Sequence, residues 1–569
     1  MSAGLSAGGA PLGPLRPDEV RRGSIAWLRR WPLLLPALVF ALPLLAALLL
    51  GLARAADGEA WQQLWADTQT LPALALSLWV GAASTLISLA VTLWLVTHLH
   101  GSRLWAWLQR SLGSLLAVPH AAFAIGLALL LMPSGLLARL LAPLLGWAYP
   151  PDIATVQDAQ GLALIAGLVL KEVPFLLWNV VAQLHRVGQG HEVERQLQIA
   201  ASMGYPARST WWRVLWPQLL PRLALPLLAV WAYGVTVVDM ALVLGPTLPP
   251  PLAVLAWQWL RDADDALGQQ GAAAALLLTL VVALGAALAW AVARLSLPAL
   301  RRRWSRGDRR DSRSRFPAAR RVAWAAAGIY ALVLGLLAFM SVAAVWTFPA
   351  LWPQVWSADA WLGVAGSGST VGLTAALALC SAVLGLLLAV AWMEGTPAHW
   401  DRRAAPLVFA PMLIPGVLLV VGLYRLSLML GIDGSFTGLW LAHALYTAPY
   451  VLVALAPAYR AFDPRYEQTA HALGRARAVF LWRVKWPMLL APMAAAFAVG
   501  FAVSVMQYLP TQFVGAGRYA TVTTEALTLA SGGQRTLTAA FALLQGVMPA
   551  AVFGLALWLG RRQARRLGR

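Results

Sequence analysis

The strongest constraint on this chain is a series of apolar runs, each long enough to cross a lipid bilayer as a helix. A membrane-spanning helix needs about 20 apolar residues, and the 569-residue sequence contains twelve such runs. The runs are continuously apolar and do not alternate with polar residues as barrel strands do. The sequence therefore predicts an all-α membrane protein with twelve transmembrane helices. Their expected ranges are 33–53, 73–97, 114–133, 161–185, 219–245, 271–295, 323–347, 369–393, 406–430, 435–458, 490–508 and 539–560.

The composition also requires a solvent other than water. Hydrophobic residues make up 60% of the chain and charged residues 12%, whereas a soluble protein carries about 25% charged residues. The formal net charge of +20 would suggest a nucleic-acid partner in a soluble protein. Here the basic residues lie in short segments between the apolar runs, with no basic face interleaved with stacking aromatic residues. We therefore expect a lipid bilayer, and no nucleic acid, as the environment of this chain.

The distribution of basic residues predicts the orientation. With the N-terminus inside, 36 of the 43 Lys and Arg residues fall in inside segments and five in outside loops, as the positive-inside rule requires. The first 31 residues contain five arginines and lack a short apolar core with a cleavage site, so we expect no cleaved signal peptide. We predict a multi-pass protein of the bacterial inner (plasma) membrane with both termini in the cytoplasm.

Metal and disulfide chemistry are not expected. The chain has one cysteine, Cys380, within an apolar run, so neither an intrachain disulfide nor a thiolate cluster can form. Of the eight histidines, His98 and His100 form an isolated pair at a membrane boundary and are interpreted as interfacial side chains. We predict no cofactor, no metal site and no catalytic residue.

Two cytoplasmic loops carry an internal repeat. The first reads QIAASMGYPARSTWWRVLWPQLLP (198–221) and the second QTAHALGRARAVFLWRVKWPMLLAP (468–492). With an offset of 270 residues, the identical positions include Ala200 and Ala470, Gly204 and Gly474, Trp212-Arg213-Val214 and Trp482-Arg483-Val484, and Trp216-Pro217 and Trp486-Pro487. More loosely, Pro119 and Gly126 match Pro415 and Gly422. The repeat divides the chain into two six-helix halves.

The composition of each loop predicts a helical hairpin. A short amphipathic helix should end near the glycine, which readily adopts positive φ. A second short helix should follow and close at the proline, which also sets the start of span five. Such a hairpin displays apolar and arginine side chains, and helix-in-groove docking on a soluble partner is its natural use.

Both copies resemble the EAA loop of ABC importer permeases, in which Glu-Ala-Ala is followed by a glycine and, ten residues on, by Ile-x-Leu-Pro. Gly204 with Val214-Leu215-Trp216-Pro217, and Gly474 with Val484-Lys485-Trp486-Pro487, fit that spacing. Gln198 and Gln468 replace the glutamate, Ile199 and Thr469 replace the first alanine, and Trp precedes both prolines. The ATPase-coupling residues implied by this resemblance are Gln198, Ala200, Ala201, Gly204, Trp212, Arg213, Pro217, Gln468, Ala470, Gly474, Trp482, Arg483 and Pro487.

The whole layout is similar to the fused permeases of iron(III)- and thiamine-type importers. This resemblance implies a type I fold with two halves related by a pseudo-two-fold axis. The halves are expected at 1–295, with a loop at 192–217, and at 323–569, with a loop at 465–487. A basic cytoplasmic linker (296–322) would join them. The implied partners are two copies of an ABC ATPase subunit and a substrate-binding protein that delivers a small-molecule or ion substrate. Iron(III), thiamine, another organic cofactor and an inorganic anion all remain open as substrates.

The sequence predicts that ATP hydrolysis takes place on another polypeptide. LASGGQR (529–535) is similar to the ABC signature sequence, but its predicted position outside the membrane makes the similarity a coincidence. A P-loop needs GxxxxGK[ST], and the two lysines, Lys171 and Lys485, do not follow a glycine. We therefore expect a transport subunit and not an enzyme.

Polar residues inside the spans are the candidates for a substrate pathway, because they are costly in a bilayer. Lys171, Glu172 and Asp239 are such residues. Lys171 and Glu172 could equally form a pair that satisfies itself within the bundle. An ion-coupled secondary transporter with twelve spans is the alternative function. It would not need matched cytoplasmic hairpins. A polytopic membrane enzyme is a third class, but no constellation of catalytic residues at one membrane face supports it.

Overall fold

The structure, a computed structural model, describes residues 33–186, 192–305 and 317–567 and is almost entirely helical there. Most of the arginine-rich N-terminal segment and the middle of the predicted linker lie outside the described residues. The elements up to the linker are α2 (Leu34–Pro36), η2 (Ala37–Ala41), α3 (Leu42–Ala55), α4 (Gly58–Ala66), α5 (Thr70–Leu99), α6 (Arg103–Ala117), α7 (His120–Leu131), α8 (Leu136–Leu145), α9 (Leu162–Arg186), α10 (Glu192–Ser202), α11 (Ala207–Thr210), η3 (Trp211–Leu215), α12 (Trp216–Leu219), η4 (Leu220–Leu223), α13 (Ala224–Thr236), α14 (Asp239–Leu244), α15 (Leu252–Leu260) and α16 (Asp265–Trp304). The elements after it are α17 (Pro317–Met340), β1 (Ala343–Val345), β2 (Val355–Trp356), α18 (Asp359–Gly366), α19 (Gly368–Gly395), α20 (Trp400–Leu413), α21 (Gly416–Met429), α22 (Phe436–Arg460), α23 (Arg465–Ala472), α24 (Arg477–Phe480), η5 (Leu481–Lys485), α25 (Trp486–Met488), α26 (Leu490–Val505), α27 (Leu509–Val514), α28 (Val522–Ser531) and α29 (Arg535–Leu567).

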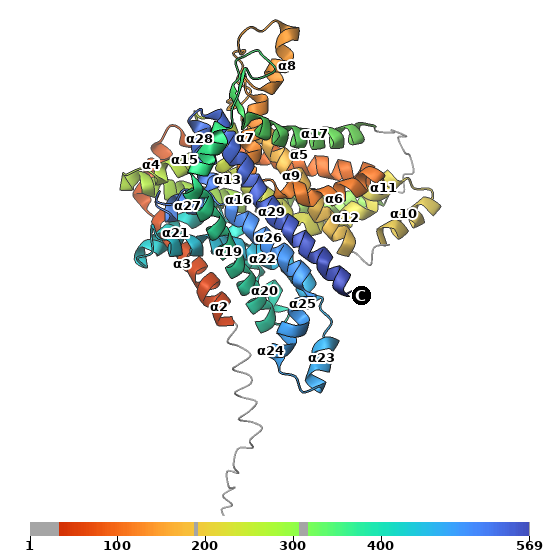
Figure 1. Cartoon of the computed structure of the whole chain (residues 1–569). Coiled ribbons are helices and arrows are strands. Elements are labelled where there is room, and N and C mark those ends of the chain that lie inside the picture. The colour runs from red at the N-terminus through yellow and green to blue at the C-terminus, as the bar shows by residue number, and fades with distance from the viewer. Residues whose placement is uncertain (1–32, 187–191, 306–316, 568–569) are drawn as a thin grey trace, which may run out of the picture.

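The helices form one elongated bundle (Figure 1). In the described part of the chain, ten helices are long and apolar enough to cross a membrane, and two bent helix pairs bring the number to twelve. The bent pairs are α20 with α21, at 98°, and residues 477–488 with α26, at 75°. Each of the twelve overlaps one of the apolar runs in the sequence. The all-α membrane fold is confirmed.

Two predicted segments differ in local structure from the simplest expectation. The expected span 114–133 contains a break between α6 and α7, because Pro119 lacks an N–H and forces the preceding Val118 into an extended conformation (ψ 122°). The expected linker (296–322) is helical over much of its described length, since α16 continues to Trp304 and α17 begins at Pro317. Alanine, leucine and arginine dominate the end of α16 and favour helix.

The first helix of each half packs against the third span of the other half. Helix α3 lies along α21, and α17 lies along α7. A Cβ on Gly422 would collide with the backbone carbonyl of Ala47, and a Cβ on Gly126 would lie 2.6 Å from a methyl group of Val333. The two matched glycines of the repeat therefore permit the same close helix crossing in both halves.

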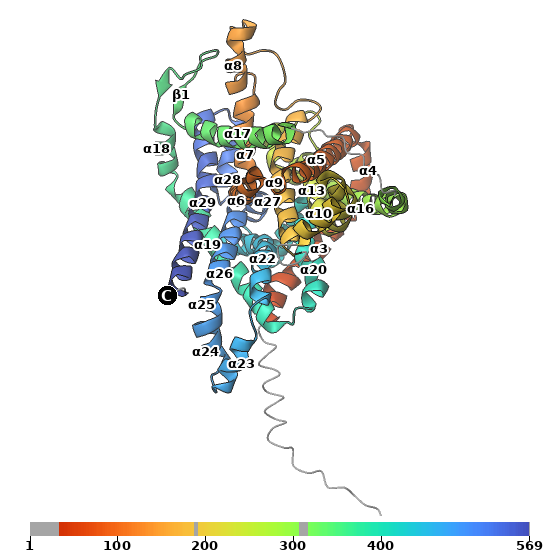
Figure 2. The ribbon, with the colours of Figure 1, turned by 90° about the vertical axis from the view of Figure 1, so that its right-hand side faces the viewer.

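One lobe projects from the bundle and joins the two halves. Figures 1 and 2 show α8 and the β1–β2 segment at the top of the molecule. The guanidinium of Arg139 on α8 is buried, lies 4.0 Å from the centre of the Trp346 ring, and donates to the carbonyls of Trp346, Thr347 and Ala350 at 2.6–2.9 Å. In Figure 1 the two repeated loops lie away from this lobe, at the right-hand and lower edges.

Candidate functional site: two matched loops and a cavity

Each loop turns at a glycine with left-handed backbone conformation. Gly204 follows α10 with φ +81°, and Gly474 follows α23 with φ +67°. In both turns, the N–H of the glycine and the N–H of the next residue donate to carbonyls three and five residues earlier, the bond pattern of a Schellman cap. The four bonds are Gly204 to Ala201 and Tyr205 to Ala200, both 2.9 Å, and Gly474 to His471 and Arg475 to Ala470, both 3.0 Å. The predicted helix stop is confirmed in both copies.

The segment after each turn contains a π-helical turn. The N–H of Trp216 donates to the carbonyl of Trp211, and that of Trp486 to the carbonyl of Leu481. This five-residue spacing shifts the hydrogen bonds immediately before the proline, which has no N–H to donate. The prediction that a short helix closes at the proline is therefore wrong for the first loop, where helical turns continue from Ala207 to Thr236. In the second loop the chain bends two residues after the proline, at Leu489.

The first loop is attached to the spans by apolar packing. Trp211 and Trp216 are fully buried, and they lie in a cluster with α5, α6 and α9. The indole of Trp216 donates to the hydroxyl of Thr97 at 2.9 Å. The ring of His100 lies between Trp105 and Trp211, with centroids 5.8 and 5.1 Å away. Burial lowers the pKa of His100, and the carboxylate of Glu194 on α10 opposes that effect only in part.

The second loop is attached by charged groups. The carboxylate of Glu394, at the end of α19, lies 2.5 Å from the ammonium of Lys485 and 2.6 Å from the guanidinium of Arg477. It also accepts a hydrogen bond from the hydroxyl of Tyr459 at 2.7 Å. That hydroxyl accepts a bond from the indole of Trp486 at 3.0 Å. All five residues therefore form one connected network beneath the loop.

Both loops expose matched side chains. Met203 and Leu473 precede the glycines and are exposed, and Trp212 and Trp482 are 41% and 70% exposed. Gln198, Gln468, Ala201 and Arg483 are exposed, as is Pro487, whereas Ala200, Ala470, Arg213 and Pro217 are half-buried. The exposure of the matched residues therefore agrees between the loops at the glutamine and the tryptophan and differs at the arginine and the proline.

Lys171 and Glu172 do not pair. Among the described residues, no ion pair joins them, and adjacent helix positions point in different directions. The ammonium of Lys171 is buried and donates to the carbonyl of Val118 at 2.6 Å, at the break between α6 and α7. It therefore satisfies a helix end that the proline leaves open. The self-satisfying pair considered from the sequence is therefore not present as a direct ion pair.

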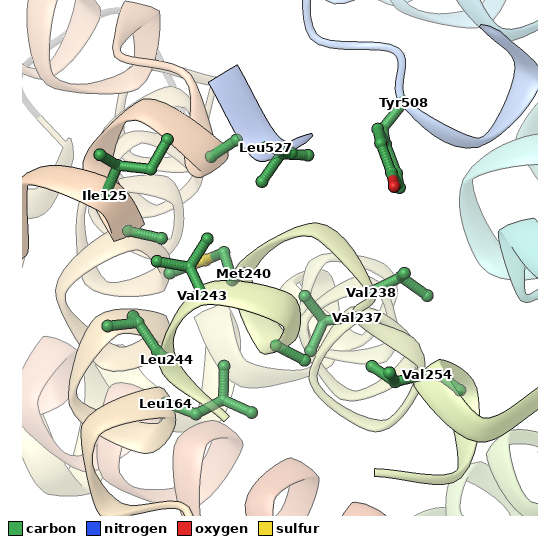
Figure 3. Packing of buried hydrophobic residues seen from close by; sticks show 14 of the residues in the cluster. Ile125, Leu164, Val237, Val238, Met240, Val243, Leu244, Val254, Tyr508 and Leu527 are labelled. Atoms are coloured by element: carbon green, nitrogen blue, oxygen red, sulfur yellow. The ribbon is translucent and has the colours of Figure 1, made fainter. Parts of the chain in front are cut away.

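Asp239 lines a cavity of about 190 Å³ between the two halves. The cavity lies where span five breaks in each half, between α13 and α14 and between α26 and α27. Figure 3 shows Tyr508, at the second break, with its hydroxyl end directed toward Val237 and Val238 at the first. With the offset of 270, Val238 and Tyr508 are equivalent positions of the repeat. The structure thus brings two distant breaks together.

Sequence reasoning missed most of the cavity lining. The polar lining residues beyond Asp239 include Tyr233, Tyr446, Tyr450, Gln507 and Tyr508. Extending the repeat beyond the loops would have paired the two breaks, and Gln507-Tyr508-Leu509-Pro510 carries the polar and proline residues of a broken span. Among the described residues, no group of three or more His, Cys, Asp or Glu side chains is placed to hold a metal ion.

Comparison with known proteins decides the family. The chain is 34% identical over 531 residues to the inner membrane ABC transporter permease protein YnjC of Escherichia coli, covering 92% of this chain and 95% of the relative. This chain is an ABC transporter permease. The permease is also 26% identical over 118 residues to the spermidine/putrescine permease PotC of Haemophilus influenzae, and 25% identical over 158 residues to the putrescine permease PotI of Escherichia coli.

These shorter matches cover 21% and 26% of the permease, and 46% and 56% of the respective relatives. No protein-family model matches the permease. The full-length match and the membrane-spanning helices together make it a multi-pass inner-membrane transport protein.

Proposed function

We propose that the permease is the membrane subunit of an importer in which two copies of a separate ATPase subunit bind residues 192–217 and 465–487. The observation that carries this proposal is the identical cap at Gly204 and Gly474, which gives both loops the same turn. An exposed apolar residue before each glycine and an exposed tryptophan after it suit docking into a groove of a soluble partner. The chain has no P-loop lysine, so ATP hydrolysis belongs to the partner.

The transport cycle follows from the presence of two equivalent docking sites for the ATPase subunits. Closure of the ATPase subunits on ATP pulls the two loops together and tilts the two helix bundles as rigid bodies. This motion opens the cavity at the span-five breaks toward a substrate-binding protein outside the cell. Hydrolysis returns the bundles and releases the solute inward. The loops and both termini face the cytoplasm in this scheme, in keeping with the excess of arginine in those segments.

The test introduces charge at the two turns. Gly204→Asp and Gly474→Asp place a carboxylate on an exposed turn, and a Cβ at Gly474 meets no other atom within 4 Å. Aspartate tolerates the left-handed conformation, so the cost in folding is about 1 kcal/mol. We expect normal membrane insertion and loss of ATP-driven uptake in the double variant. The measurements are uptake into cells and co-purification of the P-loop ATPase with the permease.

The matched control is Gly204→Asn with Gly474→Asn, which imposes the same backbone cost without the charge. We expect this control to retain the ATPase and much of its uptake. Normal uptake by the double aspartate variant would refute the docking role of the turns.

A further inference from the structure

The cavity at the span-five breaks has an unusual lining. Its polar side chains are Tyr233, Tyr446, Tyr450 and Tyr508 together with Asp239, Gln507 and Thr236. No lysine, arginine or histidine is among the described residues that line it. Its lining thus holds one carboxylate, four aromatic rings and no cationic side chain.

The hydrogen-bond donors of this lining are partly used by the protein. The hydroxyl of Tyr233 donates to Oδ1 of Asp239 at 3.1 Å, and that of Tyr446 to the carbonyl of Gly416 at 3.4 Å. A tyrosine whose hydroxyl already donates a hydrogen bond to the protein can offer a ligand only the lone pairs of its oxygen and the face of its ring. The face of an aromatic ring is negative and attracts cations. The cavity therefore presents more acceptors than donors.

The charge of Lys171 interacts with the carboxylate of Asp239, but it does so from outside the cavity lining. The ammonium of Lys171 is directed at the Val118 carbonyl and lies 5.9 Å from the centre of the Tyr330 ring. The ring of His120 packs against that of Tyr233, with centroids 5.0 Å apart. Glu172 is buried beside Lys171. None of the three lines the cavity.

We propose that this cavity selects a small organic cation, an amine or a quaternary ammonium, and rejects inorganic anions. An ammonium group pairs with the carboxylate of Asp239 and lies against the tyrosine rings. A sulfate or phosphate meets the same carboxylate and loses its hydration without gaining a cationic partner. The inference rests on the proposed function, because it takes the cavity as part of the substrate path.

The test uses the full-length permease in lipid nanodiscs. Thermal unfolding is followed by tryptophan fluorescence at constant ionic strength, with putrescine, choline or thiamine in one series and sulfate or phosphate in the other. We expect the cations alone to raise the unfolding temperature. Asp239→Asn should weaken their apparent affinity about tenfold or more, and Tyr450→Leu several-fold. The exposed residues Asp359 and Tyr149 supply the controls, since Asp359→Asn and Tyr149→Leu should leave the cation response unchanged.

A second variant protects the test against misfolding of the first. Gln507→Lys places an ammonium in the lining and should abolish the cation response while creating one to sulfate. Stabilisation of the unmodified permease by anions, no stabilisation by any of the three cations, or a cation response that survives both Asp239→Asn and Gln507→Lys would overturn the inference. Co-purification of the ATPase is scored separately: if it is retained while the cation response is absent, the substrate class is wrong and the importer role stands. If the ATPase is lost while the cation response is kept, the importer role is wrong and the substrate class stands.

Discussion

The two loops share one turn but are attached to the membrane helices in different ways. The first buries Trp211 and Trp216 in an apolar cluster, while the second rests on the carboxylate of Glu394. At the position equivalent to Lys485, the first loop has the buried Leu215. Apolar packing is insensitive to salt, whereas a partly exposed ion network is screened by it. The turn, the exposed apolar residue before it and the exposed tryptophan after it are thus common to both loops, whereas the attachment and the exposure of the matched arginine and proline differ.

The largest expected difference comes from the matched tryptophans. Trp216→Ala removes a buried indole and its bond to Thr97, so local opening of the first loop should become easier by about 3–5 kcal/mol. Trp486→Ala removes a half-buried indole and should cost the second loop about 1–2 kcal/mol. Amide hydrogen exchange of residues 207–215 and 477–485 measures both. Equal losses in the two loops would remove the distinction between them.

Removal of charge should affect the second loop alone. Glu394→Gln leaves the ammonium of Lys485 without a carboxylate partner and leaves the guanidinium of Arg477 only the longer ion pair with Glu467, at 3.7 Å, at a cost of about 2 kcal/mol to the closed loop. Amide exchange of residues 477–485 should rise, while that of 207–215 stays constant. Addition of 1 M NaCl to the unmodified permease should produce the same change at smaller amplitude. A comparable response in the first loop would contradict the assignment.

The smallest effect should follow pH and appear in the first loop. Because burial lowers the pKa of folded His100, the opened loop binds a proton at a higher pH than the closed loop does. Stability of the first loop should therefore fall as the pH drops from 7.5 to 5.5, through the ordinary histidine pKa of about 6.5. His100→Gln should abolish this difference in amide exchange. Increased protection of the first loop at low pH would show that the sign is wrong.

The success of prediction differed between the loops and the cavity. The glycine turns could be predicted from the sequence because the hydrogen bonds of the cap are made within six residues, from Ala200 to Tyr205. The number of spans followed from apolar length alone. The cavity could not be predicted in this way: Asp239 was singled out, but Tyr446 and Tyr508, which line the cavity with it, lie more than 200 residues away in the sequence. Lys171 was interpreted through Glu172, its neighbour in sequence, and its partner is the Val118 carbonyl 53 residues away.

The sequence by itself determined the membrane fold, the repeat and the two capped turns, since each depends on the transfer of apolar segments into lipid or on bonds within one turn of the chain. Only the tertiary structure decided how each loop is attached and what lines the cavity. The bond from Trp216 to Thr97 spans 119 residues and that from Lys485 to Glu394 spans 91. Contacts of this range depend on how the helices pack against each other, and a pattern along one segment carries no record of that packing.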